Sequence, residues 1–454
     1  MKTHFTDRQG VHNPATIATN REKPLKVAIV GSGISGLGLA HALRGQAQLT
    51  LFEAGSYFGG HTNTVDLTLD GPQGPVTHGV DTGFLVFNER TYPRLIQLFL
   101  DLKVPTERSD MSFSVQVPGA NGQAPLEWSG SSLNTVFAQR RNIANPRFLR
   151  MLRDVLRFNR IATDIAKRGV EAEMMQPLSD FLDEHRLSAE FRDWYFLPML
   201  GCIWSCPTDQ MLQFPVATMI RFCHNHGLIQ VTNRPQWWTV AGGARQYVQK
   251  IVAGIADKRL NTPVQHITRN AQGVTVHSKG QSEHFDKVVL ACHSDQSLTL
   301  LGDATGVERD MLSAIRYQPN HAVLHTDTSV LPRARNAWAA WNYQRSTETR
   351  KDAAQVCLHY LINRLQPVPF KQAVVVSLNP LVDIDPAHVH ARFDYAHPVF
   401  DVAAIEAQRK VRDLQGQRNT YFCGAWTGYG FHEDGLKSGL DVATQLLAEH
   451  RTPR

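Results

Sequence analysis

What the sequence lacks excludes several classes of protein. Its 454 residues contain no uninterrupted apolar run of the roughly 18 residues that a membrane span needs. The six cysteines are scattered and form no C-x-x-C pair, which is typical of reduced thiols in a cytosolic protein and not of a disulfide scaffold or a zinc site. There is also no internal repeat and no low-complexity tract. We therefore expect a globular protein without a bound metal.

The first residues lack a targeting signal as well. Segment 1–24 is polar and has no apolar stretch of the kind that marks a secretory signal. We expect this segment to be a flexible lead-in to the first strand, and we expect the protein to be cytoplasmic.

The first informative stretch is residues 26–43, where a short apolar run precedes a glycine-rich turn. Residues 27–30 are small or β-branched and apolar, as in a strand that is buried on both faces of a parallel sheet. Gly31, Gly33 and Gly36 follow with the spacing G-x-G-x-x-G, ahead of a helical pattern. In such a turn the first glycine permits the bend, the second lets a pyrophosphate approach the backbone, and the third lets helix and strand pack closely. The predicted phosphate-binding residues are Gly31, Ser32, Gly33, Ile34, Ser35 and Gly36.

A carboxylate follows this turn near the distance that a dinucleotide site requires. Residues 49–52 form a second apolar run that ends in Glu53, 17 residues after Gly36. At about this spacing, an acidic side chain at the end of the second strand accepts hydrogen bonds from a ribose. The two halves together predict a dinucleotide-binding unit in which Glu53 binds the ribose.

The residues after Glu53 indicate which dinucleotide is bound. Residues 53–62 read E-A-G-S-Y-F-G-G-H-T and resemble the E-A-x-x-x-x-G-G-R-x pattern of the flavin amine oxidase superfamily. That superfamily includes amine oxidases, phytoene desaturases and protoporphyrinogen oxidases, all of which bind FAD. The resemblance implies FAD as the cofactor and adds to its site Glu53, Ala54, Gly60, His61 and Thr62.

Three later segments carry the same resemblance. Residues 79–83, G-V-D-T-G, resemble the segment that passes close to the flavin ring, although a tight turn that needs glycine and aspartate would look the same. Residues 261–267 resemble the strand whose valine contacts the adenine through its backbone. Residues 421–439 resemble the C-terminal flavin motif, in which a strand ends in glycine and a helix begins under the flavin. The FAD contacts that these segments imply are Asp81, Gly83, Val264, Gly424, Asp434 and Gly435.

The resemblance also implies a two-lobed α/β fold. One lobe would be a doubly wound, Rossmann-like FAD-binding lobe, and an α+β substrate lobe would be inserted into it. A chain of this length also exceeds one usual core. We expect the FAD-binding lobe to comprise 25–91, 235–299 and 410–448, and the substrate lobe to comprise the largely helical 92–234 together with 300–409.

The sequence departs from the family pattern at several positions near the flavin. His61 replaces the arginine that most relatives place against the pyrophosphate, so a fixed charge becomes titratable. Ala425 and Trp426 replace an acidic position, and Asp434 stands where the motif usually has glycine. Phe431 occupies the position of a cage tyrosine in true amine oxidases, which weakens the case for oxidation of a free amine. These versions of the motifs resemble a bacterial subgroup linked with membrane fatty-acid modification.

Polar residues at the start of the last helix are the candidates for catalysis. We predict that His432, Glu433 and Tyr429 line the flavin, with His432 as an acid or a base. Each of the three could instead cap or anchor the last helix.

One segment carries the basic character of the chain. Residues 139–168 contain nine Lys or Arg and two Asp, a local balance of +7 in a chain whose net charge is +6. At 3.6 residues per turn, the arginines of this helix share a narrow face. Such a helix lies on anionic lipid, guides an anionic substrate, or is an outer helix with solvated arginines, whereas nucleic acid fits poorly because no aromatic side chains interleave with the arginines. The basic face is Arg150, Arg153, Arg157 and Arg160, and we expect the remaining surface to be apolar, with Phe148, Met151, Leu152, Val155, Leu156 and Phe158.

Aromatic residues concentrate in 191–238, beside the predicted flavin lobe. Any one of them is by default a core residue, but the group favours an apolar pocket. The aromatic group is Phe191, Trp194, Tyr195, Phe196, Trp204, Phe214, Phe222, Trp237 and Trp238.

The sequence contains no second G-x-G-x-x-G unit that could bind NADPH. Reoxidation of the flavin would therefore use O₂, a quinone or another carrier.

These observations predict an FAD-dependent oxidoreductase. It would oxidise or desaturate an apolar, acyl-chain substrate by hydride transfer to flavin N5. Amine oxidation is one alternative, and a mutase or isomerase reaction without net oxidation is another. A third alternative is a peripheral membrane protein in which FAD is structural and the basic helix is the working surface.

Overall fold

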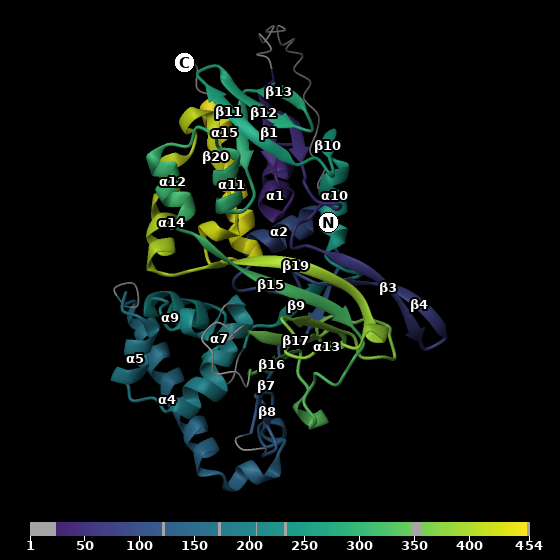
Figure 1. The fold of residues 1–454 in the computed structure, drawn as a ribbon, viewed down its shortest axis with the longest axis vertical. Coiled ribbons are helices and arrows are strands. Elements are labelled where there is room, and N and C mark those ends of the chain that lie inside the picture. Colours follow the sequence, from purple (N-terminus) through teal and green to yellow (C-terminus); the bar gives the residue numbers. More distant parts are fainter. Residues whose placement is uncertain are drawn as a thin grey trace, which may run out of the picture.

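The protein, in a computed structural model, has two lobes (Figure 1). The lead-in predicted at 1–24 lies outside the described residues apart from Pro24, and so does Cys206. One lobe contains the parallel sheet with its helices, and the other contains a second sheet beside a group of helices. The structure describes residues 24–119, 123–170, 174–205, 207–230, 234–346 and 356–451.

A five-stranded parallel sheet forms the centre of the first lobe. Its strand order is β10-β2-β1-β14-β20, so that the apolar run before the glycine turn lies in the middle. Residues 27–29 are completely buried, as a strand covered on both faces requires. The strands are β1 (Lys26–Val30), β2 (Gln48–Phe52), β10 (Asp257–Arg259), β14 (Lys287–Leu290) and β20 (Thr420–Phe422).

Two different layers cover the faces of this sheet. Val27 and Ile29 belong to the core shared with the helices that follow the glycine turn and end the chain, whereas Ala28 and Val30 face a separate apolar cluster. That cluster includes an antiparallel meander and two helices. The first layer is α1 (Ile34–Ala42), α10 (Arg245–Ala253) and α15 (His432–Arg451), and the second is β11 (Val264–Asn270), β12 (Gly273–Ser278), β13 (Gln281–Phe285), α12 (Gly306–Ser313) and α14 (Val402–Leu414).

The second layer differs from the boundaries expected from the sequence. Met311 on α12 and Val411 on α14 share one apolar cluster with Leu290 of the parallel sheet. Both helices therefore pack on the first lobe, although α12 and most of α14 fall within the segment 300–409 expected for the substrate lobe.

A seven-stranded sheet forms the centre of the second lobe, with the order β19-β15-β18-β17-β16-β7-β8. Neighbouring strands are antiparallel except for β16 and β7, whose parallel pairing joins the two chain segments that build this lobe. The long strands β15 and β19 run across the middle of the molecule, between the lobes (Figure 1). The strands are β7 (Phe113–Val117), β8 (Leu126–Ser129), β15 (Arg316–His325), β16 (Trp341–Gln344), β17 (Cys357–Leu361), β18 (Val375–Leu378) and β19 (Val389–Val399).

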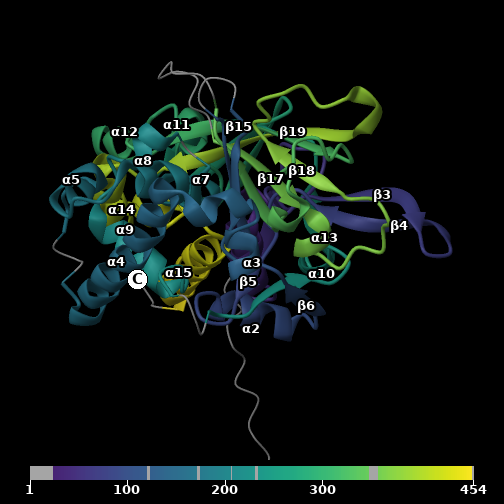
Figure 2. The same ribbon diagram turned by 90° about the horizontal axis from the view of Figure 1, so that it is seen from below.

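Helices lie beside this sheet, as the view from below shows (Figure 2). Phe158 of the long basic helix packs against Phe191 and Phe196, so these two predicted pocket residues are part of the core. The helices of this lobe are α3 (Leu133–Val136), α4 (Pro146–Arg168), α5 (Leu178–Glu184), α6 (Ala189–Phe191), α7 (Leu197–Trp204), α8 (Thr208–Met211), α9 (Val216–Asn225) and α13 (Ile362–Leu365).

The periodicity of the basic helix predicted α4 correctly but misplaced one residue. Phe148, Met151 and Phe158 are buried as expected, whereas Leu156 is 61% exposed. The buried face of α4 is centred near Met151 and Ala162, and Leu156 lies on the flank that borders the arginines. The prediction that Leu156 belongs to the packed apolar side is therefore wrong.

Short elements connect the lobes. A hairpin and a small three-stranded sheet lie between the second and tenth strands in sequence, and α11 follows β14. No helix among the described residues is long and apolar enough to span a membrane. The connecting elements are β3 (Thr64–Gly71), β4 (Gly74–Asp81), β5 (Phe87–Asn88), α2 (Pro93–Asp101), β6 (Thr106–Ser109), β9 (Trp237–Val240) and α11 (Ser294–Leu300).

Candidate active site

A cavity of about 680 Å³ is lined by both lobes. At one end it is bordered by the turn after β1 and by the end of β2, where a sheet of this kind binds its ligands. Aromatic residues of the other lobe line its remaining wall. They include Phe222, Trp341 and Tyr360, and Trp237 of the connecting strand β9 lies beside them in the wall.

The three glycines of the turn after β1 have different surroundings. Gly31 has a φ of +104°, and a Cβ there would lie 2.7 Å from the Ala291 carbonyl oxygen. A Cβ on Gly36 would lie 2.1 Å from the Gly31 carbonyl oxygen, so this glycine permits the close packing of turn and helix. Gly33, which precedes the first residue of α1, faces open space, with no atom within 4 Å of such a Cβ. The turn therefore leaves a free cradle at Gly33 before the helix N-terminus.

Glu53 is held in position at the edge of this cradle. One carboxylate oxygen accepts a hydrogen bond from the Ser32 backbone N–H at 3.0 Å, and the other accepts one from the Gly55 N–H at 2.8 Å. The first of these oxygens also accepts a hydrogen bond from the Ser32 hydroxyl, whereas the oxygen that binds Gly55 keeps a free lone pair, so the carboxylate can still accept a hydrogen bond from a ribose. Ala54 and Val264 line the same end of the cavity.

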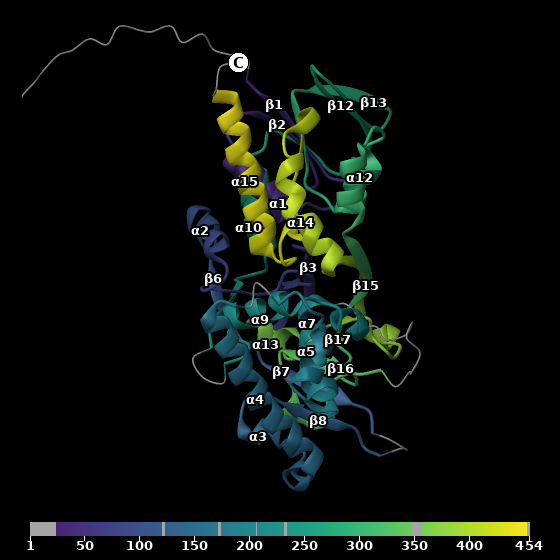
Figure 3. The same cartoon turned by 90° about the vertical axis from the view of Figure 1, so that its left-hand side faces the viewer.

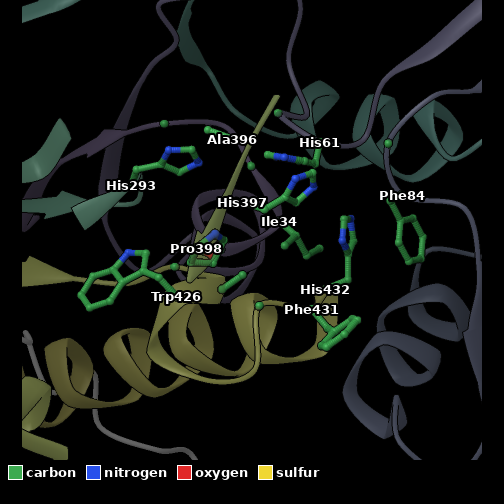
Figure 4. Close-up of a pocket in the computed structure, with 18 of the residues that line it drawn as sticks. Ile34, His61, Phe84, His293, Ala396, His397, Pro398, Trp426, Phe431 and His432 are labelled. Carbon is green, nitrogen blue, oxygen red and sulfur yellow. The ribbon is translucent and has the colours of Figure 1, made fainter. Parts of the chain in front are cut away.

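Histidines gather where the cavity passes between the lobes (Figure 4). The ring of His61 stacks on Tyr395 with 5.0 Å between the ring centroids, and lies 5.3 Å from His397 and 6.3 Å from His293. Burial, followed by the charges of His397 and His293, holds the pKa of His61 well below its usual range. His61 Nε2 is buried and has no hydrogen-bond partner among the described residues, so it is available to a bound ligand.

His432 belongs to a small hydrogen-bond network. Its Nε2 lies 2.9 Å from the Thr62 hydroxyl and 3.2 Å from the Tyr247 hydroxyl. Its ring stacks on Phe84, with 3.7 Å between the centroids. Burial lowers the pKa of His432 to about 3, so the imidazole is neutral at physiological pH. His432 lines the cavity, whereas Thr62 lies behind it.

The other two catalytic candidates are directed elsewhere. The carboxylate of Glu433 accepts hydrogen bonds from the backbone N–H groups of Arg94 and Leu95, both at 3.0 Å, and so caps the start of α2. Tyr429 packs against Phe222, with 6.1 Å between the ring centroids. Neither Glu433 nor Tyr429 lines the cavity.

Asp81 and Asp434 also act within the protein. Asp81 accepts hydrogen bonds from the Ala244 N–H at the start of α10 and from the Gln366 side chain, and burial raises its pKa to about 7. Asp434 accepts one from the Phe431 N–H at the start of α15, and burial raises its pKa to about 6. Gly36, Thr62, Asp81, Asp434 and Gly435 are thus placed behind the cavity wall, not on it.

The predicted FAD contacts that do line the cavity come from several segments of the first lobe. They are Gly31, Ser32, Gly33, Ile34, Ser35, Glu53, Ala54, Gly60, His61, Gly83, Val264 and Gly424.

Sequence reasoning missed part of the wall. His397 comes from β19, where it pairs with Gln318 of β15, and His293 precedes α11. No local motif marks either residue. Trp426 was noted only as a departure from the family pattern, yet its indole N–H donates to the Cys292 carbonyl at 3.1 Å and fixes the ring at the cavity edge.

A family profile decides the identity of this site. The profile described as flavin containing amine oxidoreductase matches residues 34–447. The chain belongs to this family. Its cofactor is therefore FAD and it is an FAD-dependent oxidoreductase, as the resemblance of its sequence implies.

Solved structures of the same fold agree with the predicted fold class. A cyclohexylamine oxidase from Brevibacterium oxydans IH-35A has a TM-score of 0.66 at 17% identity, covering 95% of this chain and all of its own. A CLA-producing fatty acid isomerase from P. acnes has a TM-score of 0.65 at 17% identity, covering 92% and 98%. Putrescine oxidase bound to putrescine has a TM-score of 0.63 at 16% identity, covering 93% and 99%. No sequence among curated proteins matches the chain.

The described residues of this flavin amine oxidoreductase fit FAD. The open cradle at Gly33 has room for a pyrophosphate, and Glu53 stands ready for a ribose. The unpaired Nε2 of His61 can donate to an anionic or carbonyl oxygen where relatives use arginine. FAD would thus be held by the backbone around Gly31 to Ser35, by Glu53 and by the wall at His61 and Gly424.

A pair of glycine variants separates cofactor binding from folding. Gly33→Ala adds a methyl group in open space at a φ of −64°, so the apoprotein should keep its Tm while FAD affinity falls at least about tenfold. Gly36→Ala drives the same methyl group into a backbone oxygen and should destabilise the apoprotein by about 3 kcal/mol. Thermal unfolding of both apoproteins and FAD titration of the Gly33 variant measure these effects. Normal FAD affinity in Gly33→Ala would contradict the assignment of the cradle.

Proposed function

We propose that this oxidoreductase oxidises or desaturates an apolar substrate with an acyl chain. The observation that carries the proposal is the composition of the cavity wall beyond the cofactor cradle. Phe222, Phe431, Trp237, Trp341 and Tyr360 line it, and Glu53, beside the cradle, is the single carboxylate among the described lining residues. An ammonium substrate would have no negative partner in this wall, whereas an alkyl chain would bury its surface against aromatic rings.

Phe431 supports the same choice. Its ring stacks on Phe222, with 5.0 Å between the centroids, and lies 5.8 Å from His226. Burial lowers the pKa of His226 to about 4, so this neighbour is neutral as well. The position that carries a cage tyrosine in amine oxidases is thus part of an uncharged aromatic wall.

The similarity of fold to solved structures does not identify the substrate class. One structural neighbour is named for a fatty acid and others for amines, all at 17% identity or below. The residues that line this cavity, and not the fold, therefore indicate the substrate. Amine oxidation and isomerisation remain the alternatives that the experiment must separate.

The chain contributes binding, exclusion of water and a proton acceptor. Bound FAD would supply the acceptor for the hydride equivalent that leaves a C–H bond. Desaturation also releases a proton, and the neutral imidazole of His432 lines the cavity in a position fixed by Phe84 and by the hydroxyls of Thr62 and Tyr247. We propose His432 as the base that accepts this proton.

Two variants of His432 test this role. Gln keeps a group that can hydrogen-bond to Thr62 and Tyr247 but cannot accept the proton, whereas Leu removes both abilities. If His432 is the base, both variants should retain flavin and lose at least about 100-fold in kcat. Full activity of His432→Gln would show that the residue only satisfies the two hydroxyls.

The pH dependence follows from the lowered pKa. A base must be unprotonated, and burial holds the pKa of His432 at about 3. The kcat of the wild type should therefore show no inflection from His432 between about pH 5 and 9, and it should fall only as the pH drops towards 3. A wild-type inflection near pH 6.5 that disappears in His432→Gln would contradict the lowered pKa of His432 while keeping the residue as the base, whereas an inflection that persists in the variant would come from another group.

A matched pair of ligands tests the substrate class. Under anaerobic conditions, dioleoyl phosphatidylcholine and oleylamine present the same chain with different polar ends. We expect the visible flavin bands to bleach with the phospholipid and not with the amine, and the acyl product to be two hydrogens lighter. Bleaching by the amine alone would establish amine oxidation, and an acyl product of unchanged mass would establish an isomerase.

Trp341 supplies a further prediction about binding. Its indole N–H is buried and has no hydrogen-bond partner among the described residues, although its ring packs edge-on to Tyr360 at 4.9 Å in the cavity wall. A carbonyl oxygen of an acyl ester can satisfy this donor. Trp341→Phe should raise KM about fivefold and leave kcat nearly unchanged, because one neutral hydrogen bond contributes about 1 kcal/mol. Trp338→Phe is the control, since the Trp338 indole N–H donates to the Pro332 carbonyl and the ring lies outside the wall.

A further inference from the structure

The second lobe ends in an exposed surface that mixes arginines with large apolar side chains. We call this surface the basic tip. It consists of α3, the turn Arg140–Ala144 and the outward face of α4. Four of the eleven exposed large hydrophobic residues in the described chain lie here within 24 residues. They are Leu133 (79% exposed), Ile143 (54%), Leu149 (44%) and Leu156 (61%).

The charge of the tip is concentrated on the same face. Arg147 and Arg150 both approach the carboxylate of Glu190, at 2.6 and 3.7 Å. Arg157 and Arg160, in contrast, have no hydrogen bond or ion pair with another described residue. Arg160 is exposed and Arg157 is half-buried, and this second pair of arginines is therefore the one available to an external anion.

The helix that presents these side chains is a preformed element. The Asn145 side chain accepts hydrogen bonds from the first backbone N–H groups of α4, and Gly169 ends the helix at a φ of +69°. The buried face, with Phe148, Met151 and Phe158, anchors α4 on the lobe. Binding through the outward face would not require the helix to fold first.

We propose that the basic tip docks on an anionic lipid surface. Arginines would contact the headgroups, while Leu149 and Leu156 would enter the boundary between headgroups and acyl chains. The alternation of leucine and arginine on one face favours lipid over nucleic acid, which would leave the leucines in water. A soluble anion would contact only the arginines, and it too would leave the leucines in water.

The position of the tip gives the docked molecule an orientation. Figure 3 places α3 and α4 at the end of the second lobe that lies furthest from α1 and the parallel sheet. Docking through the tip would hold the substrate lobe at the lipid and the FAD lobe away from it. This inference does not depend on the substrate proposed above, because an enzyme for a soluble substrate could dock in the same way.

Sedimentation with vesicles tests the docking of the FAD-loaded protein. The vesicles are pure phosphatidylcholine or phosphatidylcholine mixed with phosphatidylglycerol, each at low and at physiological salt. We expect binding to the mixed vesicles only, with an affinity that falls as salt rises. Absence of binding to mixed vesicles, or equal binding to both kinds, would overturn the proposal.

Matched variants identify the surface that binds. Arg157→Glu with Arg160→Glu should weaken binding at least about 25-fold, because each arginine near an anionic leaflet contributes roughly fivefold. The charge-matched control is Arg409→Glu with Lys410→Glu, at exposed positions on α14 in the other lobe. If the control loses as much affinity as the tip variant, net charge and not the tip would explain binding.

A second pair of variants tests the apolar contribution. Leu156→Gln should weaken vesicle binding about tenfold, since a leucine that leaves water contributes roughly that factor. Val307→Gln, at a position that is 62% exposed on α12, is the control and should bind normally. Tm and flavin content should stay at wild-type values in both variants. Unchanged binding of Leu156→Gln, or tighter binding of the wild type to DNA than to vesicles, would refute lipid docking.

Discussion

The structure depends on the close approach of two backbone segments from opposite ends of the chain. A Cβ on Gly439 of α15 would lie 2.2 Å from the Ser35 carbonyl oxygen, and one on Gly435 would lie 2.9 Å from the Ile34 side chain. Together with Gly36, these glycines let α1, the cofactor turn and α15 pack closely against one another. The cradle and His432 at the start of α15 are thus fixed against each other, and both face the same cavity.

Much of the FAD lobe was predictable because its signals are local. The strand, the turn and the carboxylate that ends the next strand lie within 28 residues, from Lys26 to Glu53, and each follows from a backbone requirement. The C-terminal glycines followed from family resemblance. Glu433 shows what local signals cannot predict. Its carboxylate caps α2 and does not line the cavity, because the folded chain places the start of α2 beside it. The start of a helix predicts a polar cluster but not the partner that each side chain finds.

The rest of the site could not be read from the sequence because distant pairings create it. His397 reaches His61 through the register of β19 on β15, and Trp341 reaches the wall through a strand that pairs with β7, more than 220 residues earlier. In α4, periodicity defined the helix, but which flank is covered depends on the elements that pack against it, so Leu156 was misplaced. The cofactor site can therefore be predicted from the sequence more completely than the substrate site. The cofactor site depends on glycines that lie close together in the sequence, whereas the substrate site depends on the pairing of strands that are far apart in it.

The order of the strands has a consequence for how the protein is made. The parallel sheet contains β20 as its fifth strand, and β20 with α15 comes from the last part of the chain. During synthesis, the sheet edge beside β14 and the wall at Gly424 stay open until β20 and α15 have left the ribosome. Flavin capture therefore has to wait for these two elements, although the glycine turn is made hundreds of residues earlier, and a protein without α15 would lack a complete binding site for its cofactor.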